Sequence, residues 1–455
     1  MDLKDLKNIH VISIGGSVMH DLAINLKKNG YNITGSDDII YDPSKTRLKR
    51  QGILPKSLGY SKVNIHDQID LVITGMHTKK NNIELIESKK KNIPILSYPE
   101  YIEILSKNKH RIVIAGSHGK TTITSMIMHV LKKNKIKFDY LIGAKTNGFK
   151  SNISLSDNPI MIIEGDEYLT SPLDKTPKFL KYNHHIVLVN GIEWDHFNVF
   201  KSLKVYKEQF KKLINMTPKG GEIVYYENDE SIVEILNSHI DENVVLRPYN
   251  IEKFENNKLN SFIFDQDNKK IKLKIFGKHN MQNLAGAKII CEQLGVKKAD
   301  FYKSISSYEL PHRRLQIISD KKNKIFRDFA HSPSKLEATI SAVKLQYPEK
   351  LLSVYELHSS SSFDLTFLKN YKDTLQESDF SVIFISENNL KKFSRKVDEN
   401  VIKNIFNEKK LILITNNIEL DKFINKSDYK SYNKLLMSSG NFDGYNVEKI
   451  NNENK

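Results

Sequence analysis

The sequence lacks the features that mark secreted and membrane proteins. It has a single cysteine, Cys291, so no disulfide can form within the chain. No apolar run approaches the roughly 18 residues that a membrane-spanning helix needs. The first ten residues alternate charged and apolar side chains and lack the apolar core of a signal peptide. We therefore expect a cytoplasmic protein without membrane association, and we expect Cys291 to pack inward from a helix.

The positive charge of the chain is not concentrated in one segment. The 455 residues carry a formal net charge of +16, but lysine and asparagine are spread over the whole length. No basic segment alternates with aromatic residues as in proteins that stack on nucleic acid. We therefore expect a phosphate-rich small substrate and no nucleic acid. The sequence leaves the oligomeric state open.

Short runs of isoleucine and valine alternate with amphipathic stretches of helix length. This order is typical of parallel sheets whose strands are connected by helices. Because 455 residues exceed one hydrophobic core, we predict three α/β domains, residues 1–107, 108–308 and 309–455. Half-exposed antiparallel strands are expected between 221 and 276. The predicted strands lie at 11–14, 31–34, 71–74, 93–96, 111–115, 160–163, 186–189, 261–264, 271–276, 325–329, 351–357, 380–385 and 411–415.

The clearest functional motif is the segment 115–122, Ala-Gly-Ser-His-Gly-Lys-Thr-Thr, between a predicted strand and an amphipathic helix. Glycines there let consecutive backbone N–H groups face one anion, and the helix N-terminus adds partial positive charge. Lys120 can reach terminal phosphate oxygens, and Thr121 can bind Mg²⁺. Two residues separate the glycines, where the usual phosphate loop has four. The sequence predicts a nucleotide triphosphate site formed by Gly116, Ser117, His118, Gly119, Lys120, Thr121 and Thr122.

Acidic residues follow two predicted strands of the middle domain. The carboxyl ends of parallel strands meet at one edge of a sheet, where ligands bind, and Mg²⁺ prefers oxygen ligands. We therefore predict a metal–nucleotide site at this edge. A solvated loop is the alternative for either group alone, above all for Asp195. The residues of the two groups are Glu164, Asp166, Glu167, Glu193, Asp195 and His196.

A second glycine turn, Gly15-Gly16-Ser17, follows the first predicted strand, and Ser36-Asp37 ends the next strand about 20 residues later. This order resembles a dinucleotide-binding βαβ unit. The third glycine of the Gly-x-Gly-x-x-Gly fingerprint is missing, so the turn departs from the pattern of a nicotinamide cofactor site. We predict that a different nucleotide diphosphate binds here, and a tight turn without a ligand is the alternative.

Taken with later motifs, these segments resemble the Mur ligases of peptidoglycan synthesis, in that family's order and over the whole chain. The resemblance implies a Rossmann-like UDP-sugar-binding domain (1–107), a central P-loop ATPase domain (108–308) with a mainly parallel sheet plus a small antiparallel one, and a Rossmann-like domain (309–455) that binds the incoming amine. The later motifs are Gly277-Lys-His-Asn280-Met-Gln-Asn283, Arg313-Arg314-Leu315 and Asp328-Phe-Ala-His331-Ser-Pro.

The resemblance also implies a role for individual residues. Lys120 is expected to clamp the phosphates, Thr121 and Glu164 to bind one Mg²⁺, and His196 to bind a second. Asn280 and Asn283 are expected on the adenine side of ATP, Arg314 on its phosphates and Asp328 on its ribose. Structural alternatives are a helix cap for Asn280 and a strand end for Asp328. The implied catalytic residues are Lys120, Glu164, His196 and Arg314, and the implied UDP-sugar site is Gly15, Gly16, Ser17, Ser36 and Asp37.

Members of the family differ in the amine that they add to the lactyl carboxylate of UDP-N-acetylmuramate through an acyl phosphate. Tyr168 and the segment Asp174-Lys175-Thr-Pro-Lys178-Phe179 resemble members that add the tripeptide L-Ala-γ-D-Glu-meso-diaminopimelate in peptidoglycan recycling. We therefore predict the tripeptide as acceptor, with L-alanine as the alternative. Gly165 in place of the usual alanine and Glu356-Leu-His-Ser depart from the family pattern.

Three other functions are alternatives to a Mur ligase. A nucleotide-binding sensor would use ATP to close domains without ligation. A dehydrogenase rests only on the first βαβ unit. A folylpolyglutamate-type ligase shares the ATPase motifs but usually lacks a separate UDP-binding domain.

Overall fold

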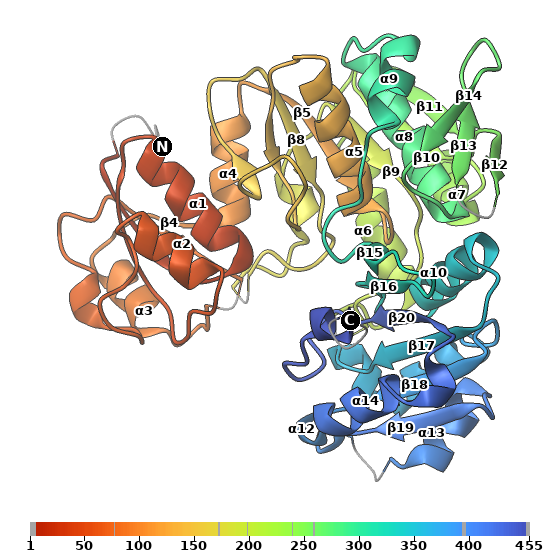
Figure 1. Cartoon of the computed structure of the whole chain (residues 1–455). Helices are drawn as coiled ribbons and strands as arrows, with labels where there is room; N and C mark the ends of the chain where they lie inside the picture. Colours follow the sequence, from red (N-terminus) through yellow and green to blue (C-terminus); the bar gives the residue numbers. More distant parts are fainter. Residues whose placement is uncertain are drawn as a thin grey trace. The chain divides into compact units, whose positions relative to one another are not determined.

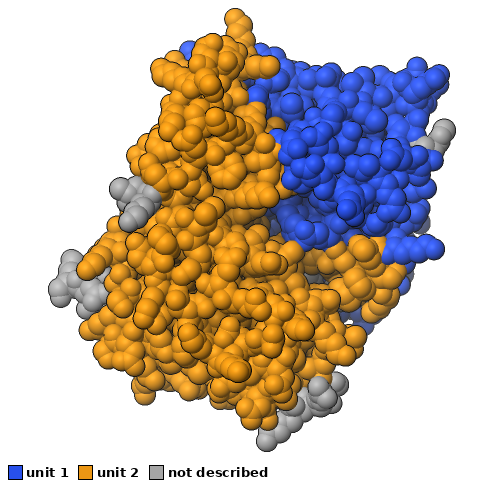
Figure 2. Space-filling view, turned by 90° about the vertical axis from the view of Figure 1, so that its right-hand side faces the viewer, with its two compact units in different colours: residues 1–193, 204–250, 286–296 blue, residues 194–203, 251–285, 297–455 orange. Residues whose placement is uncertain are grey.

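The computed structural model describes residues 6–76, 78–171, 173–197, 199–238, 240–257, 260–393 and 397–451. These described residues form four β-sheets connected by helices (Figure 1). It divides into two compact units, coloured separately in Figure 2. Unit 1 comprises residues 1–193, 204–250 and 286–296, and unit 2 comprises 194–203, 251–285 and 297–455.

The first sheet lies in unit 1 and has four parallel strands in the order β2-β1-β3-β4. The central strand β1 ends at Ile12 because Ser13 adopts a positive φ of 64°, which interrupts extended backbone. The strands are β1 (Asn8–Ile12), β2 (Asn32–Ser36), β3 (Leu71–Thr74) and β4 (Ile95–Ser97). The helices are α1 (Ser17–Lys28), α2 (Ser44–Arg50), α3 (Ile83–Lys90) and α4 (Tyr98–Ser106).

The second sheet of unit 1 has seven strands in the order β11-β10-β9-β5-β8-β6-β7. All pairs are parallel except β6 with β7, and the residues of β9 are all buried, as expected for a strand covered on both faces. Since β5 lies between β8 and β9, the carboxyl ends of these three strands are adjacent. The strands are β5 (His110–Ala115), β6 (Asp139–Leu141), β7 (Ile153–Ser154), β8 (Ile160–Glu164), β9 (Ile186–Val189), β10 (Glu222–Tyr226) and β11 (Val245–Tyr249).

The helix after the β5 strand follows the predicted amphipathic pattern. Helix α5 buries Ile123, Ile127, Val130 and Leu131. Cys291 is buried on α8, as predicted, and burial raises the pKa of its thiol well above the usual value. The helices that follow strands of this sheet are α5 (Lys120–Lys133), α6 (Leu203–Asn215) and α7 (Glu230–Ser238). Helix α8 (Lys278–Gln293) begins in unit 2 and ends in unit 1, and α9 (Lys298–Ile305) belongs to unit 2.

A small antiparallel sheet in unit 2 contains β12 (Phe254–Asn256), β13 (Ser261–Phe264) and β14 (Lys270–Leu273). It confirms the expected half-exposed strands at 261–264 and from 271, but β14 ends at Leu273 and not at 276. The expectation is wrong for 222–249, where β10 and β11 extend the parallel sheet. There Ile223 and Val224 are consecutive and both buried, which the alternating pattern does not describe.

The large sheet of unit 2 has the order β15-β16-β20-β17-β18-β19, parallel except for the edge strand β15. It has a buried apolar cluster on each face, one containing Leu336 and Ile340 of α10 and the other containing Leu420 and Phe423 of α14. The strands are β15 (Gln316–Ser319), β16 (Ile325–Asp328), β17 (Leu351–Glu356), β18 (Phe380–Phe384), β19 (Leu411–Ile414) and β20 (Asn433–Met437). The helices are α10 (Pro333–Gln346), α11 (Leu365–Leu368), α12 (Glu387–Leu390), α13 (Glu399–Phe406) and α14 (Asn417–Ile424).

Together these sheets confirm the predicted α/β class, with mainly parallel sheets and a small antiparallel one. The division into three domains at 107/108 and 308/309 stays a prediction. Among the described residues, no helix combines the length and the apolar character needed to cross a bilayer.

Candidate active site

The loop between β5 and α5 has a backbone that depends on its two glycines. Gly116 and Gly119 have φ angles of 131° and 75°, which side chains rarely adopt. A Cβ atom at Gly116 would also lie 3.0 Å from the backbone nitrogen of Asn190. Gly119 is the N-cap of α5, so the loop ends directly at a helix N-terminus. This geometry fits the predicted anion-binding role of the loop.

Two side chains of the loop hold it in place. The buried Ser117 hydroxyl donates a hydrogen bond to the Glu193 carbonyl oxygen (2.7 Å) and contacts the Tyr206 hydroxyl (2.9 Å). His118 Nε2 lies 2.6 Å from a carboxylate oxygen of Glu193. The Ser117 side chain therefore anchors the loop. Its predicted contact with ATP would be made by the backbone N–H.

Lys120 places a cation at the start of α5. Its Nζ donates to the Gly116 carbonyl oxygen (2.7 Å) and lies 2.8 Å from Glu167 Oε2. Burial alone would lower the pKa of Lys120, but the carboxylates of Glu167, Asp166 and Glu164 raise it above its usual value. Lys120 is therefore protonated throughout the neutral range, as a phosphate clamp requires.

Thr121 and Glu164 form the oxygen-rich part of the site. The Thr121 hydroxyl donates to Glu164 Oε1 (2.7 Å), and Glu164 Oε2 accepts the backbone N–H of Gly143 (2.7 Å). One hydroxyl and one carboxylate, next to a helix N-terminus, are ligands that suit Mg²⁺. The two predicted metal ligands of unit 1 are thus in direct contact. Thr122 is buried on the first turn of α5.

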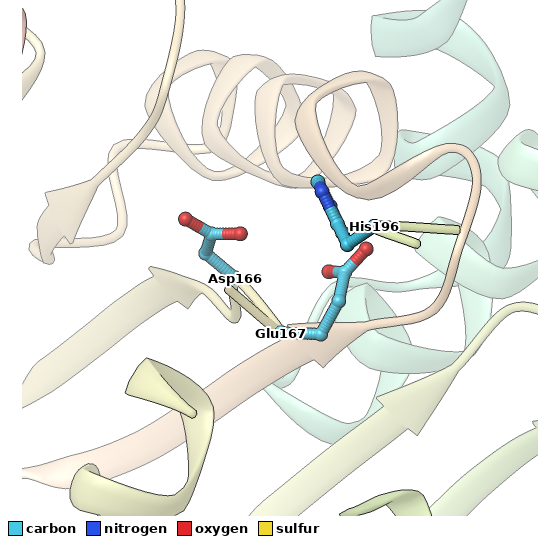
Figure 3. Close-up of side chains that lie close together, drawn as sticks. All are labelled: Asp166, Glu167 and His196. Atoms are coloured by element: carbon cyan, nitrogen blue, oxygen red, sulfur yellow. The ribbon is translucent and has the colours of Figure 1, made fainter. Parts of the chain in front are cut away.

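The chain after β8 carries two more carboxylates, Asp166 and Glu167, whose side chains are drawn in Figure 3. Asp166 is paired with the buried Lys178, whose Nζ lies 2.5 Å from Oδ2. Gly165 lies between these carboxylates and β8. A side chain there would clash, because a Cβ atom would lie 2.6 Å from Val113 Cγ1. The departure from the usual alanine therefore follows from close packing against β5.

His196, also labelled in Figure 3, belongs to unit 2. Its φ angle is 55°, and its backbone N–H donates to Asp195 Oδ1 (2.7 Å). Asp195 is buried and accepts a hydrogen bond from Lys335 Nζ (2.7 Å). Burial alone would raise the pKa of Asp195, but the Lys335 ammonium holds it well below its usual range. Asp195 is therefore an ionised anchor inside unit 2, and the metal-binding role of His196 stays a prediction.

The remaining predicted ATP residues also lie in unit 2. Asn280 and Asn283 are buried on α8, where Asn280 Nδ2 donates to the Phe276 carbonyl oxygen (2.8 Å). The Arg314 guanidinium lies 4.5 Å from the centre of the Phe329 ring. Burial raises the pKa of Asp328, whose carboxylate accepts the backbone N–H groups of Leu315 and Ala330. Asp328 thus also shapes the end of β16.

The second glycine turn joins β1 to α1 in unit 1. The Gly15 backbone N–H donates to Asp37 Oδ2 (2.8 Å), and burial raises the pKa of Asp37. A Cβ atom at Gly15 would lie 2.9 Å from the same oxygen, so the close approach requires glycine. Ser17 is exposed at the start of α1, and the Ser36 hydroxyl is buried against Glu84. The structure thus brings the turn and Asp37 together, whereas the Ser36 hydroxyl is bonded to Glu84 inside the domain.

A cavity of about 270 Å³ opens among the loops that follow β2 and β3, and Asp38 in its wall is the chain neighbour of Asp37. The Tyr60 hydroxyl of its wall lies 3.3 Å from Ser13 Oγ at the end of β1. The cavity lies at the carboxyl edge of a parallel sheet, where ligands of α/β proteins bind. Its lining residues are Asp38, Tyr60, Lys79, Asn81, Asn82 and Ile83.

Several of these residues escaped the sequence analysis. Tyr60, Lys79 and Asn81 belong to loops without a motif. One feature of the sequence could have indicated the role of Lys335. A lysine in the first turn of a helix is unfavourable next to the helix dipole, so an anionic partner is expected nearby. Tyr206 reaches Ser117 from α6, far along the chain, and nothing in its local sequence marks it.

Comparison with known proteins agrees with this geometry. Residues 8–110 match the model of the Mur ligase family catalytic domain, and residues 114–291 match that of the Mur ligase middle domain. A Haemophilus influenzae protein, UDP-N-acetylmuramate–L-alanyl-γ-D-glutamyl-meso-2,6-diaminoheptandioate ligase, is 31% identical over 78% of this chain and 81% of its own length. UDP-N-acetylmuramate–L-alanine ligase of Clostridium botulinum is 33% identical over 78% of both chains.

Solved structures show the same fold. A murein peptide ligase of Psychrobacter arcticus has a TM-score of 0.68 at 23% identity, covering 98% of this chain and 97% of its own. UDP-N-acetylmuramate–alanine ligase of Thermotoga maritima has a TM-score of 0.73 at 22% identity and 96% coverage of both chains. The identity and coverage of the curated relatives confirm the predicted family. The chain belongs to the Mur ligases, the ATP-dependent ligases of peptidoglycan synthesis.

Proposed function

We propose that this chain joins L-Ala-γ-D-Glu-meso-diaminopimelate to the lactyl carboxylate of UDP-N-acetylmuramate, with release of ADP and phosphate. The observation that carries the ligase chemistry is the paired arrangement of Lys120 with Glu167 and of Thr121 with Glu164, at the carboxyl ends of β5 and β8. The relatives named above act on UDP-N-acetylmuramate, which supports the same substrate here.

In the proposed reaction, a carboxylate oxygen of UDP-N-acetylmuramate attacks the γ-phosphorus of ATP, and the bond to ADP breaks. The acceptor amine then attacks the carbonyl carbon of the acyl phosphate, loses a proton, and inorganic phosphate leaves. Phosphoryl transfer of this kind depends mainly on positioning and charge neutralisation. Lys120 supplies a fixed cation for the phosphates, and the loop N–H groups hold their oxygens. Mg²⁺ bound by Thr121 and Glu164 would add charge neutralisation.

The proposal assigns the other predicted residues as follows. Arg314 reaches the ATP phosphates, Asn280 and Asn283 the adenine and Asp328 the ribose, while His196 binds a second Mg²⁺. The UDP-sugar binds at the Gly15–Ser17 turn and in the cavity lined by Tyr60 and Lys79. The domains 1–107, 108–308 and 309–455 bind UDP-sugar, ATP and acceptor amine.

The choice of the tripeptide rests on the segment around Lys178. Its buried ammonium pairs with Asp166 and lies over the ring of Tyr168 at 5.8 Å, so the Tyr168 and Asp174–Phe179 elements of the resemblance form one local structure. Burial alone would lower the pKa of Lys178, but Asp166 raises it, which keeps the pair charged. L-alanine is the second acceptor, favoured by the 33% identity to the Clostridium botulinum enzyme.

A panel of acceptors tests the proposal. The wild-type protein is incubated with ATP, Mg²⁺ and UDP-N-acetylmuramate plus tripeptide, L-alanine or no amine, and the nucleotide products are identified by mass spectrometry. The tripeptide adduct is expected to form fastest. Faster formation of the L-alanine adduct would replace the tripeptide assignment, and absence of any adduct would refute the proposed reaction.

A further inference from the structure

A histidine on α1 contacts the proposed UDP-sugar turn. His20 Nδ1 lies 2.8 Å from the carbonyl oxygen of Gly16, and its Nε2 lies 2.8 Å from Arg47 Nη1 on α2. A guanidinium only donates hydrogen bonds, so Nε2 must accept, and the ring proton is on Nδ1, from which it is donated to Gly16. His20 is therefore neutral and joins the turn to Arg47.

The same arginine continues to the second sheet of unit 1. Arg47 forms an ion pair with Asp21, whose side chain is fully buried, and its Nη2 donates to the Lys150 carbonyl oxygen (3.2 Å). Asp21 Oδ2 accepts the backbone N–H of Asn152 (2.8 Å). Helix α1 is thus joined to the segment around β7 by the Asp21–Arg47 pair. Two further residues of α1 strengthen the link, since Asn25 Nδ2 donates to the Ile153 carbonyl oxygen (2.9 Å) and Asn29 Nδ2 to that of Leu155 (3.1 Å).

Backbone hydrogen bonds carry the connection on to the proposed ATP site. The Asn152 carbonyl oxygen accepts the N–H of Ile142 (2.9 Å), and the next residue, Gly143, donates its N–H to Glu164 Oε2 (2.7 Å). Glu164 in turn accepts the Thr121 hydroxyl. A continuous path of hydrogen bonds, one ion pair and chain neighbours therefore runs from the Gly16 carbonyl to Thr121 within unit 1.

We propose that His20, Asp21 and Arg47 are positioning residues of the ligase, which fix the turn Gly15–Ser17 at a set distance from Glu164 and Thr121. This inference rests on the proposed function, because that reaction needs the substrate carboxylate to meet the γ-phosphate. Misplacement of reacting groups by about 1 Å can lower a rate about 100-fold. Elements that bind two substrates at separate strand ends therefore need a rigid link.

Arg47→Lys tests the link while keeping a positive charge beside Asp21. A single ammonium cannot replace the fork of the guanidinium, which reaches His20, Asp21 and the Lys150 carbonyl at once. We expect kcat to fall about tenfold and KM for ATP to change less than about twofold. Lys91→Met is the matched control, because it removes an exposed ion pair with Asp67 in the same part of unit 1.

Two variants of His20 cut the path at different bonds. Asn places a donor near the position of Nδ1 and keeps the Gly16 bond, whereas Gln reaches the position of Nε2 and keeps the Arg47 bond. If the path must be continuous, His20→Asn and His20→Gln both weaken binding of UDP-N-acetylmuramate by about fivefold in calorimetric titration. A defect in only one of the two variants would show a local role and overturn the proposal.

The pH dependence of the same titration gives a readout that a merely structural role would not change. The charged groups facing His20 are Asp21 on its own helix and Arg47 on α2, and burial lowers the pKa of His20 below 6.5. Protonation would put an N–H against the guanidinium, so UDP-N-acetylmuramate binding should weaken as pH falls below 6.5, and should not do so in His20→Asn.

The possible failures are distinguishable. Wild-type protein that does not bind UDP-N-acetylmuramate would refute the proposed function and this inference with it. Wild-type binding and turnover, with unchanged kcat in Arg47→Lys and unchanged binding in the His20 variants, would refute the positioning role alone. Thermal unfolding of each variant without ligands identifies the folded fraction, to which kcat is referred.

Discussion

The two glycine turns of unit 1 occupy the same position between a strand and a helix but differ in their residues. Each follows a central strand of a parallel sheet and begins a helix, β1 to α1 and β5 to α5. The loop before α5 has two glycines with positive φ and a lysine paired with a carboxylate. The turn before α1 has neither, and the Gly15 N–H is already bonded to Asp37. Its first helical turn contains no lysine or arginine.

This difference agrees with the proposed roles, phosphoryl transfer at the loop before α5 and substrate binding at the turn before α1. A transferred phosphoryl group develops charge that needs a fixed cation and metal ligands, and in the proposed reaction Lys120 and Thr121 of the β5–α5 loop would supply them. A diphosphate that is only bound needs backbone donors and a helix N-terminus. Substitutions at the first loop should therefore lower kcat or raise the Mg²⁺ requirement, whereas those at the second turn should raise KM for UDP-N-acetylmuramate.

The largest effect is expected for Lys120→Met. Loss of the ammonium removes the cation next to the phosphates, so kcat for ADP release should fall about 1,000-fold. ADP release with UDP-N-acetylmuramate and tripeptide is measured by a coupled assay, per folded molecule. Lys109→Met is the control, since Lys109 also forms a buried ion pair, with Asp139 at 2.9 Å, at the opposite end of β5.

Both variants leave a buried carboxylate without its lysine, so both should lose stability. Only Lys120→Met should lose kcat. Equal kcat losses in the two variants would mean that the effect of Lys120 is structural, and the contrast between the two turns would fail.

A smaller effect is expected for Thr121→Val, which removes the hydroxyl bonded to Glu164 and keeps the side-chain shape. The Mg²⁺ concentration for half-maximal activity should rise about 10- to 100-fold. Thr124→Val is the control, because Thr124 is buried on the same helix and its hydroxyl has no hydrogen-bond partner among the described residues. Unchanged Mg²⁺ dependence in Thr121→Val would remove Thr121 from the metal site.

The two turns also show which features of a site can be predicted from sequence. The loop 116–122 was predicted together with its strand and helix, because glycine conformation and helix periodicity are local properties. The pairing of Lys120 with Glu167 was not, because it joins segments 47 residues apart. For the same reason Lys335 was missed as the partner of Asp195, although both belong to unit 2.

Strand β20 shows the same limit for the fold. It lies between β16 and β17 at the centre of its sheet, yet it begins with Asn433 and Lys434, which look solvent-exposed in sequence. The Asn433 side chain accepts the backbone N–H of Lys324, and Lys434 Nζ donates to the Tyr429 carbonyl oxygen. Polar residues with partners elsewhere in the chain conceal a buried strand from a hydropathy pattern.

At the second turn, Asp37→Asn should act on binding alone. The amide keeps the size of the side chain but replaces one of the two carboxylate oxygens with a donor, so the bond to the Gly15 N–H weakens. KM for UDP-N-acetylmuramate should rise about tenfold, which corresponds to about 1.4 kcal/mol, with kcat and KM for ATP retained. Asp67→Asn, on an exposed side chain, is the control. A fall in kcat without a change in KM would contradict the binding role of this turn.

The smallest effect concerns the amino end of β9, opposite the edge that carries the phosphate loop. Burial lowers the pKa of His184 to about 3, and its Nε2 lies 2.9 Å from Thr217 Oγ1. The unfolded chain binds a proton below pH 6.5 and the folded chain does not, so folding stability falls as pH falls. This one residue should account for about 1 kcal/mol between pH 6.5 and 5.5.

His184→Gln keeps a group near Thr217 and removes the titration. Its free energy of unfolding, measured in urea, should therefore fall less than that of the wild type over this pH range, by about 1 kcal/mol. Its kcat and both KM values at pH 7.5 should equal those of the wild type, because neither glycine turn lies at this edge. A kinetic change in His184→Gln would show that residues at the amino edge of the sheet also affect the site. The difference between the two glycine turns would then not be enough to explain kcat and KM.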